Sequence, residues 1–227
     1  MMVGAYAAQI RKQISALVLL ILTACAAPTN AGPVPLTVHA SSAAYPWLSS
    51  VYDCAPASAV ILLSDGPEAD VVLRLGESEE MSAPAYQIGT DDLIVVTHPG
   101  VGVGSLATAQ VEALFTGQFT SWSEVGGADL PVQVWAYAPT VDIEGYFERT
   151  ILHGRPVTSL SHLAVSAQQM SDSAGATPGS IGFLPRRWKA GNTREVMPVS
   201  SLPVLALVRG APEGPLAELL ACMQAHP

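Results

Sequence analysis

The sequence LATAQVEALFTGQFTSWSEVGGADLPVQV, residues 106–134, predicts more about the fold than any other stretch of this chain. Its first part spaces apolar residues as a helix does, over Thr108–Phe115, and Gly117 ends that helix. Trp122 follows in a polar loop that closes on two glycines. From Pro131 onward, apolar and polar residues alternate as they do in a strand. The stretch therefore predicts one helix, loop and strand unit of an α/β protein.

Strand-like and helix-like segments alternate along the rest of the chain. Short, nearly all-apolar runs are typical of buried parallel strands, and longer amphipathic segments lie between them. This alternation is the signature of an α/β protein. The predicted strands cover 36–39, 59–63, 70–75, 93–96, 131–135, 181–184 and 204–208, and the predicted helices cover 45–54, 108–115, 143–152, 161–170 and 215–224.

The composition indicates a globular and acidic protein. The chain has 227 residues, of which 49% are hydrophobic and only 13% charged, so it can bury a sizeable core. Its 10 basic residues face 19 acidic ones, giving a net charge of −9. This balance argues against nucleic acid and against an anionic membrane surface as partners. It does not exclude a small anion, because backbone N–H groups can hold one whatever the net charge.

The N-terminal segment has the pattern of a secretory signal. Arg11 and Lys12 precede an apolar run, Ile14–Leu22, which is too short to span a bilayer as a core helix. The ending LTAC, residues 22–25, resembles the lipobox of bacterial lipoproteins, and this resemblance implies cleavage before Cys25 and attachment of a diacyl lipid to it; an ordinary signal peptide with an incidental Cys is the alternative. We expect 1–24 to be the signal peptide, 25–35 a tether, and the mature chain to be anchored by lipid on the periplasmic or extracellular face of the membrane.

Two further cysteines remain, Cys54 in the first predicted helix and Cys222 in the last. Export to an oxidising compartment permits a disulfide between them. Two half-buried free thiols are the alternative, since the sequence does not give the separation of the two Cα atoms.

The order of residues in the opening stretch resembles one family, the phosphate-binding-protein-like solute receptors of bacterial ABC importers. The segment TPGSIGF, residues 177–183, resembles the x-P-G-A-I-G-Y segment of the same family. The likeness covers most of the mature chain and is strongest from Asp91 to Pro185. The matching positions of the opening stretch are Leu106, Gln110, Val111, Leu114, Phe115, Gly117, Phe119, Trp122, Val125, Gly126, Gly127, Asp129, Pro131 and Val132.

This resemblance implies a two-lobed α/β fold of the type 2 periplasmic-binding-protein kind, with two crossing hinge strands and a ligand cleft between lobes that close on it. Lobe one is expected to comprise 36–99 plus 186–227, and lobe two 100–185, with crossings near 96–100 and 184–187. Trp122 is expected to be buried in lobe two. The implied partners are a small solute and an ABC permease, and the implied state is a monomer.

The turn at 40–44 is the first candidate for ligand contact. It follows a predicted strand and opens a predicted helix, which is where α/β sheets bind ligands. The family carries a phosphate-gripping Gly-Ser-Thr-like turn here; Ser41 and Ser42 match it, and Ala40 replaces the Gly. Simple capping of the helix by Ser is the alternative.

The second ligand-contacting segment expected from the family is altered. Tyr137 stands where the family has an Arg, and Val141, Asp142 and Ile143 stand where it has Ser-Gly-Thr. Thr140 could cap the helix but lies one residue early. Because a carboxylate at 142 would repel phosphate, we expect phosphate not to be a tight ligand. The resemblance with this change implies a neutral or cationic ligand, or an empty cleft.

Arg74 falls where the family has a Ser-Arg-like element, which makes it a further candidate for ligand contact. The acidic residues that follow it could equally hold it in a surface ion pair of little energetic value.

Catalytic and metal-binding patterns are absent from the sequence. There is no G-x-S-x-G, the five His lack metal-ligand spacing, and GVGVG at 100–104 lacks the order of a dinucleotide loop. We therefore expect no enzyme activity, no catalytic residue, no metal and no cofactor. The predicted function is an extracytoplasmic substrate-binding lipoprotein of an ABC transporter; the alternative is a non-transporting interaction or sensing lipoprotein that retains the fold without a ligand.

Overall fold

An eight-stranded sheet is the frame of the protein, with strand order β2-β1-β3-β8-β4-β7-β5-β6. The computed structural model describes residues 32–77, 83–139 and 141–226. The chain divides into two units, 1–33 and 34–227, and the fold is that of the second. The expected signal segment and Cys25 lie outside the described residues. The strands are β1 Val34–Ala40, β2 Ala59–Leu63, β3 Val71–Leu75, β4 Ala85–Thr97, β5 Gln133–Tyr137, β6 His162–Ala164, β7 Ser180–Pro185 and β8 Arg194–Val208.

Helices and short 3₁₀ turns connect these strands. In the described part of the chain, no helix is long and apolar enough to cross a bilayer. The α-helices are α2 Leu48–Asp53, α3 Thr108–Phe115, α4 Glu144–Thr150, α5 Ala167–Ala176 and α6 Gly214–Ala225, and the 3₁₀ turns are η1 Tyr45–Trp47, η2 Pro99–Val101, η3 Trp122–Val125 and η4 Arg186–Trp188.

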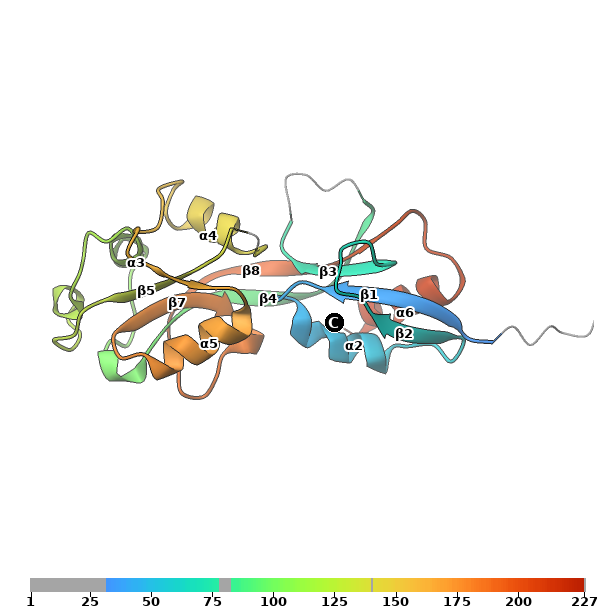
Figure 1. Cartoon of the computed structure of the whole chain (residues 1–227), viewed down its shortest axis with the longest axis horizontal. Coiled ribbons are helices and arrows are strands. Elements are labelled where there is room, and N and C mark those ends of the chain that lie inside the picture. The colour runs from blue at the N-terminus through green and yellow to red at the C-terminus, as the bar shows by residue number, and fades with distance from the viewer. Residues whose placement is uncertain (1–31, 78–82, 140, 227) are drawn as a thin grey trace, which may run out of the picture. The chain divides into compact units, whose positions relative to one another are not determined.

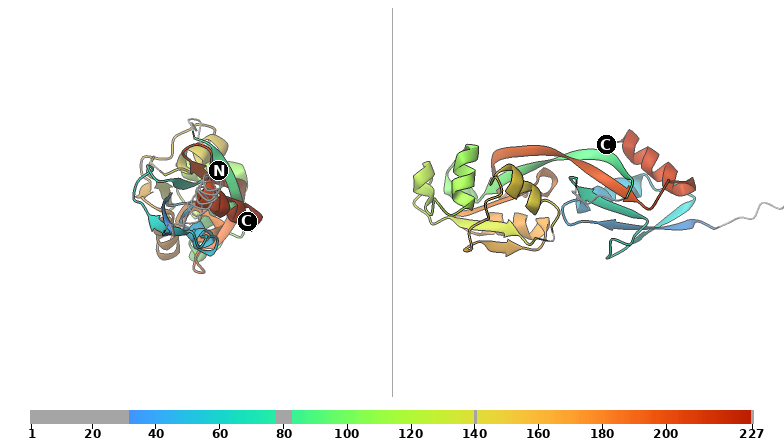
Figure 2. Two further views of the ribbon diagram at one scale, coloured as in Figure 1. Left: turned by 90° about the vertical axis from the view of Figure 1, so that its right-hand side faces the viewer. Right: turned by 90° about the horizontal axis from the view of Figure 1, so that it is seen from above.

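Two long antiparallel strands, β4 and β8, divide the sheet into two lobes (Figures 1 and 2). The end of β8 pairs with β3, which leads to β1 and β2, and this side of the sheet is lobe one. The end of β4 pairs with β7, which leads to β5 and β6, and this side is lobe two. Register shifts interrupt the β4–β8 pairing at three places, and such irregularities bend a strand pair locally. The two-lobed α/β fold with two crossing strands is therefore confirmed.

The second crossing lies later in the chain than the sequence predicts. The predicted crossing at 184–187 begins at the end of β7, and this strand stays in lobe two between β4 and β5. The crossing strand is β8, whose first residues pair with the end of β4 and whose last residues pair with β3. The sequence does not predict the full length of this strand, because it contains Pro198 and Pro203 and proline is rare inside paired strands.

Two other elements differ from the sequence-based expectation. The strand β2 is an edge strand with Val60 and Leu62 exposed at 44% and 46%, although its apolar run is typical of a buried strand. The predicted helix 161–170 is instead the strand β6 followed by α5. Pairing with β5 holds the first part extended, and the Ser166 side chain accepts a hydrogen bond from the Gln169 N–H to start the helix.

The two motifs that define lobe two pack against each other. Trp122 is fully buried, as predicted, and its Nε1 donates to the Gly179 carbonyl at 2.8 Å. Gly179 has a φ of +77°, and a Cβ there would lie 2.2 Å from the Pro131 carbonyl oxygen. Only glycine fits this position. The motif at 177–183 therefore depends on the backbone of the motif at 106–134.

The two lobes differ in how helices cover their sheets. In lobe two, α3 and α4 face Phe183 of β7 and α5 faces Gly182, so both faces are covered. In the described residues of lobe one, α2 and α6 pack together on one face, where the disulfide Cys54–Cys222 joins them with a Cα separation of 5.6 Å. The opposite face of β1, β3 and β8 carries the candidate site.

Candidate functional site

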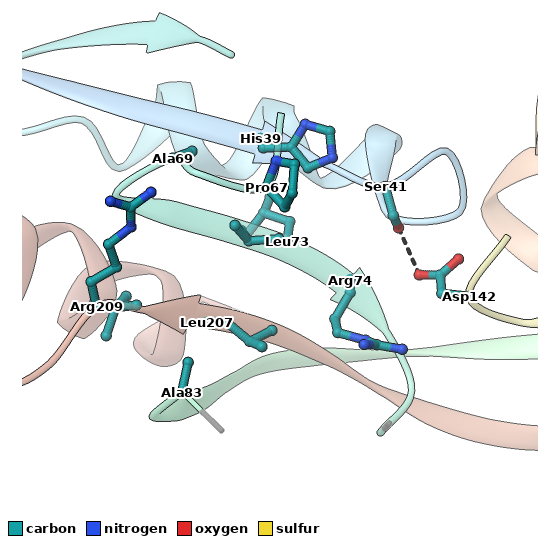
Figure 3. A pocket seen from close by; sticks show the side chains of 12 residues that line it. His39, Ser41, Pro67, Ala69, Leu73, Arg74, Ala83, Asp142, Leu207 and Arg209 are labelled. Carbon is teal, nitrogen blue, oxygen red and sulfur yellow. Dashed lines mark hydrogen bonds between the residues drawn. The ribbon is translucent and has the colours of Figure 1, made fainter. Parts of the chain in front are cut away.

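A cavity of about 320 Å³ lies over β1, β3 and the end of β8 in lobe one, and one residue of lobe two reaches it (Figure 3). The residue from lobe two is Asp142, in the connection between β5 and α4. Arg74 and Asp142 lie at one end of the cavity, and Arg209 lies at the other. Apolar residues such as Leu73 and Leu207 line the space between them. The cavity therefore has an apolar wall and charged ends.

Ser41 is placed at the cavity by the end of β1. Its N–H donates to the Leu73 carbonyl at 2.9 Å, which continues the β1–β3 pairing by one residue. Its hydroxyl is oriented toward lobe two and donates to Oδ2 of Asp142 at 2.7 Å. The Leu75 N–H, at the end of β3, donates to the same oxygen at 3.0 Å. Two donors of lobe one thus converge on one carboxylate oxygen of lobe two.

The second oxygen of that carboxylate has no partner. Oδ1 of Asp142 is buried and accepts no hydrogen bond from the described residues. A buried carboxylate oxygen without a donor is costly, so this position favours an additional donor. Arg74 lies at the same end of the cavity, with its Nε donating to the Gly76 carbonyl at 3.1 Å.

The other serine of the predicted turn does not line the cavity. Ser42 is half-buried and forms no part of the cavity wall. The helix expected behind the serines is the 3₁₀ turn η1 followed by α2, and the Ala44 N–H donates to the Ser41 hydroxyl at 3.3 Å. Ser41 therefore accepts within its own turn, as the capping alternative requires, and at the same time donates to Asp142.

Tyr137 and Thr140 were the predicted ligand contacts of lobe two. Tyr137 is 2% exposed and packs edge-on against Phe183, with 5.1 Å between ring centroids, so it lies in the lobe-two core and does not line this cavity. Its hydroxyl has no partner among the described residues. Burial raises the pKa of that hydroxyl well above its usual value, and the nearby carboxylates of Glu144 and Asp142 add to the effect. Thr140 lies outside the described residues.

Glu144 is a titratable group of lobe two that the sequence did not single out. It is 6% exposed, and its Oε2 accepts a hydrogen bond from the Tyr137 N–H at 2.8 Å. Burial raises the pKa of Glu144 to about 7, although the Tyr137 N–H lowers it and Glu148 raises it slightly. A Glu in the first turn of a helix is common on solvated faces, so the sequence carries no signal that this one is buried.

The chemistry of the site is that of binding. Lobe one supplies a hydroxyl, a backbone N–H and cationic side chains, while lobe two supplies a carboxylate. Among the described residues, three side chains of metal-binding kinds lie together, Cys54, Cys222 and His226, and the disulfide joins both of these cysteines. The arrangement suits recognition of a small solute through hydrogen bonds.

Comparison with known proteins identifies relatives of this architecture. The model of the PBP superfamily domain matches residues 59–218. The phosphate-binding protein PstS of Bacillus subtilis (strain 168) is 24% identical over 177 residues, which cover 66% of this chain and 56% of that protein. The chain thus aligns with little more than half the length of this curated relative.

Two solved structures share the fold over most of their length. A putative phosphate ABC transporter substrate-binding protein with bound phosphate from Clostridium perfringens superposes with a TM-score of 0.73, at 15% identity, over 83% of this chain and 92% of its own. An ABC-type phosphate transport receptor from Vibrio cholerae superposes with a TM-score of 0.63, at 16% identity, over 84% of this chain and 94% of its own. Together with the two lobes, the crossing strands and the matched domain, these similarities establish that the chain belongs to the PBP superfamily.

Proposed function

We propose that this protein is the extracytoplasmic substrate-binding component of an ABC transporter, anchored to the membrane through a lipid on Cys25. The observation that carries the proposal is the cavity to which both lobes contribute, since Ser41 and Arg74 come from lobe one and Asp142 from lobe two. Lobes that share a binding space can close on a solute and present the closed form to a permease. The relatives named above support this assignment, because their names describe phosphate binding and transport.

The ligand we propose is a neutral or cationic small solute rather than phosphate. A desolvated phosphate needs donors around most of its oxygens, and an Arg of lobe two would supply two at once. This chain has Tyr137 at that position, buried away from the cavity, and a carboxylate from Asp142 at the cavity itself. The Asp142 carboxylate at the cavity instead suits a solute with an N–H or ammonium donor.

Calorimetry at neutral pH tests the exclusion of phosphate. We expect no heat of binding at micromolar phosphate, and a sub-micromolar Kd would contradict the proposal. A thermal-shift screen of small metabolites, including amines and neutral polar solutes, then searches for the ligand. A solute present at 100 times its Kd should add roughly 2.7 kcal/mol to the free energy of unfolding. Failure of every solute to shift the transition would count against the transport role.

The lipid anchor has its own test. Mass spectrometry of protein extracted from membranes should find an acylated Cys25 as the first residue, in agreement with the LTAC ending. Soluble protein that begins at another residue would contradict this part of the proposal.

A second candidate function is a non-transporting interaction or sensing lipoprotein that keeps the fold. The contact between Ser41 and Asp142 favours it, because the two lobes are joined directly through their own side chains. Permease and ATPase genes beside this one, and co-purification with that permease, would support transport. Their absence, together with a negative solute screen, would support the second candidate.

A further inference from the structure

We propose that the Asp142 side chain is a tethered anion that occupies the oxyanion-binding place of lobe one and thereby excludes free oxyanions from the cleft. Asp142 is then a specificity-determining residue, whose removal uncovers an oxyanion site in this same chain. The inference rests on the proposed function for the location of the ligand site. It goes beyond that function because it names what fills the site and what would bind once the occupant is removed.

The first step of the argument is the convergence of donors on one oxygen. The Ser41 hydroxyl and the Leu75 N–H reach Oδ2 of Asp142 at 2.7 and 3.0 Å. Ser41 follows β1 and Leu75 ends β3, and these two strands pair in parallel, so both donors lie at one edge of the sheet. The carboxyl ends of parallel strands are where α/β sheets bind ligands. The carboxylate oxygen therefore stands where an oxygen of a bound oxyanion would stand.

The second step is the origin of the carboxylate. Asp142 is separated from Ser41 by 101 residues and from Leu75 by 67 residues, and it belongs to the other lobe. The contact is thus not local capping within a turn. It connects the two walls of the cleft in the way that a bound ligand would.

The third step is the charge around the carboxylate. Arg74 lies at the same end of the cavity, and His39 and Arg209 line it further away. The Glu68 side chain is held by Arg209, so that cation is partly neutralised. Glu144 faces Tyr137 on the lobe-two side. A free phosphate placed beside Asp142 would meet a like charge at close range, where repulsion is strong.

The fourth step is the advantage of a tethered competitor. A group held beside its partner by the chain acts at a high effective concentration, so a free ligand must displace it before it binds. Its apparent affinity falls in proportion to the fraction of molecules in which the donors are uncovered. Lobe one can therefore keep a working oxyanion site, formed by the Ser41 hydroxyl and the Leu75 N–H, that binds no free oxyanion in the intact protein.

The test is calorimetry of inorganic phosphate and sulfate with the full mature chain and its Asp142→Ala variant. We expect the variant to bind at least one of the two anions about tenfold or more tightly than the unaltered protein, because the competitor has been removed. The matched control is Asp172→Ala, which removes the same charge from an exposed site on α5 whose carboxylate accepts from the Gln168 side chain. The control should bind as the unaltered protein does.

A second variant tests whether the gained affinity depends on the lobe-one donors. Adding Ser41→Ala to Asp142→Ala should remove most of the gain, since one of the two donors is lost. A folded Asp142→Ala protein that binds both anions no more tightly than the unaltered protein would overturn the inference, and so would a gain that Ser41→Ala leaves intact. If Asp142→Ala does not fold, Asp142→Asn replaces it, with the same expected direction because the charge is lost.

Hydrogen exchange of the unaltered protein provides a test that needs no variant. The Leu75 N–H should exchange slowly, since Asp142 accepts its hydrogen bond. Fast exchange of this amide would overturn the inference. The outcome is distinguishable from that of the proposed function, because a gain of oxyanion binding by Asp142→Ala stands even if the unaltered protein binds no solute. Conversely, a solute that binds the unaltered protein leaves the transport proposal intact if no gain appears.

Discussion

The two walls of the cleft carry opposite hydrogen-bonding chemistry. The lobe-one wall presents donors, the Ser41 hydroxyl and the Leu75 N–H, at the ends of two paired strands. The lobe-two wall presents acceptors, the Asp142 carboxylate at the cavity and the buried Glu144 carboxylate behind it. A fully deprotonated oxyanion such as sulfate only accepts hydrogen bonds, so a receptor for it needs donors on both walls. Here the walls complement each other, so the closed cleft satisfies part of its own polar surface.

The two walls also depend on different supports. The donor wall consists of strand ends, which the sheet fixes through backbone hydrogen bonds. The acceptor wall follows β5 and begins α4, a helix of seven residues held from behind by an aromatic cluster. Changes to each support should therefore affect the two walls separately, and the following predictions run from the largest expected effect to the smallest.

Removal of the aromatic support should disrupt the acceptor wall most. Phe147 of α4 is fully buried and stacks on Phe183 with ring centroids 3.8 Å apart. We expect Phe147→Ala to lower the free energy of unfolding by about 3 to 5 kcal/mol, through lost burial and the cavity that remains. Urea denaturation measures this loss. The neighbouring Tyr146→Ala, on a half-buried side chain, should cost clearly less; equal losses would show that the stack is not the anchor of α4.

Loss of the disulfide should lower the stability of lobe one, whose opposite face carries the donor wall. Cys54 and Cys222 are 168 residues apart in sequence, and both lie on the helical face of lobe one. Replacing both with Ser should cost about 2 to 4 kcal/mol, mainly because the unfolded chain regains freedom. Chemical denaturation with and without reductant measures the difference. Sensitivity of the double variant to reductant would contradict the assignment, since the variant keeps one cysteine of the three in the sequence, Cys25.

Protonation of Glu144 should make the acceptor wall pH-sensitive. Its pKa in the folded protein is about 7, above the ordinary 4.5, so the folded state binds a proton that the unfolded state has released. Stability from this group is present below about pH 4.5 and is lost as pH rises through 7. At pH 8 we expect Glu144→Gln to be more stable than the unaltered protein by roughly 2 to 3 kcal/mol, and nearly equal at pH 4.

Thermal denaturation across pH 4 to 8 checks this prediction. Gln can still accept the hydrogen bond from the Tyr137 N–H, so the variant isolates the charge. The control is Glu213→Gln, at an exposed Glu just before α6 in lobe one, which should leave the pH profile almost unchanged. A stability difference that grows toward acid pH would have the wrong sign and would refute a raised pKa.

Removal of the hydroxyl that joins the two walls should have the smallest effect on stability. Ser41→Ala leaves Oδ2 of Asp142 with the Leu75 N–H alone, and we expect a loss of about 1 to 2 kcal/mol. A double-mutant cycle with Asp142→Ala measures the coupling between the two side chains. Ser49→Ala, at an exposed serine whose hydroxyl donates to the Pro46 carbonyl, serves as the control. Additive effects would mean that the contact does not stabilise the closed cleft.

The sequence alone predicted the elements whose signals are local. The helix Thr108–Phe115 has the bounds that its apolar spacing and Gly117 indicate. Trp122 is buried as its motif implies, and the α/β fold follows from the alternation of strand and helix patterns. These features could be predicted because periodicity, glycine punctuation and a resemblance at fixed spacing are all contained in short stretches of chain.

Topology was predicted less well where an element's neighbours decide its role. The run at Ala59–Leu63 is apolar enough for a buried strand, but its position beyond β1 makes it an edge. The crossing strand β8 was only half predicted, because its first residues lack the apolar run that marks its end. Pairing partners determine both outcomes, and a single sequence does not name them.

The site itself shows the same division between local and distant information. The sequence identified Ser41, Arg74 and the unusual Asp142, because each stands at a position that a strand end or a family motif marks. Only the tertiary structure decided that Asp142 accepts from Ser41 and Leu75, that Tyr137 is oriented into the core, and that Glu144 is buried. Hydrogen bonds between lobes and the burial of a carboxylate depend on residues brought together from distant parts of the chain, and this proximity arises only when the sheet has formed.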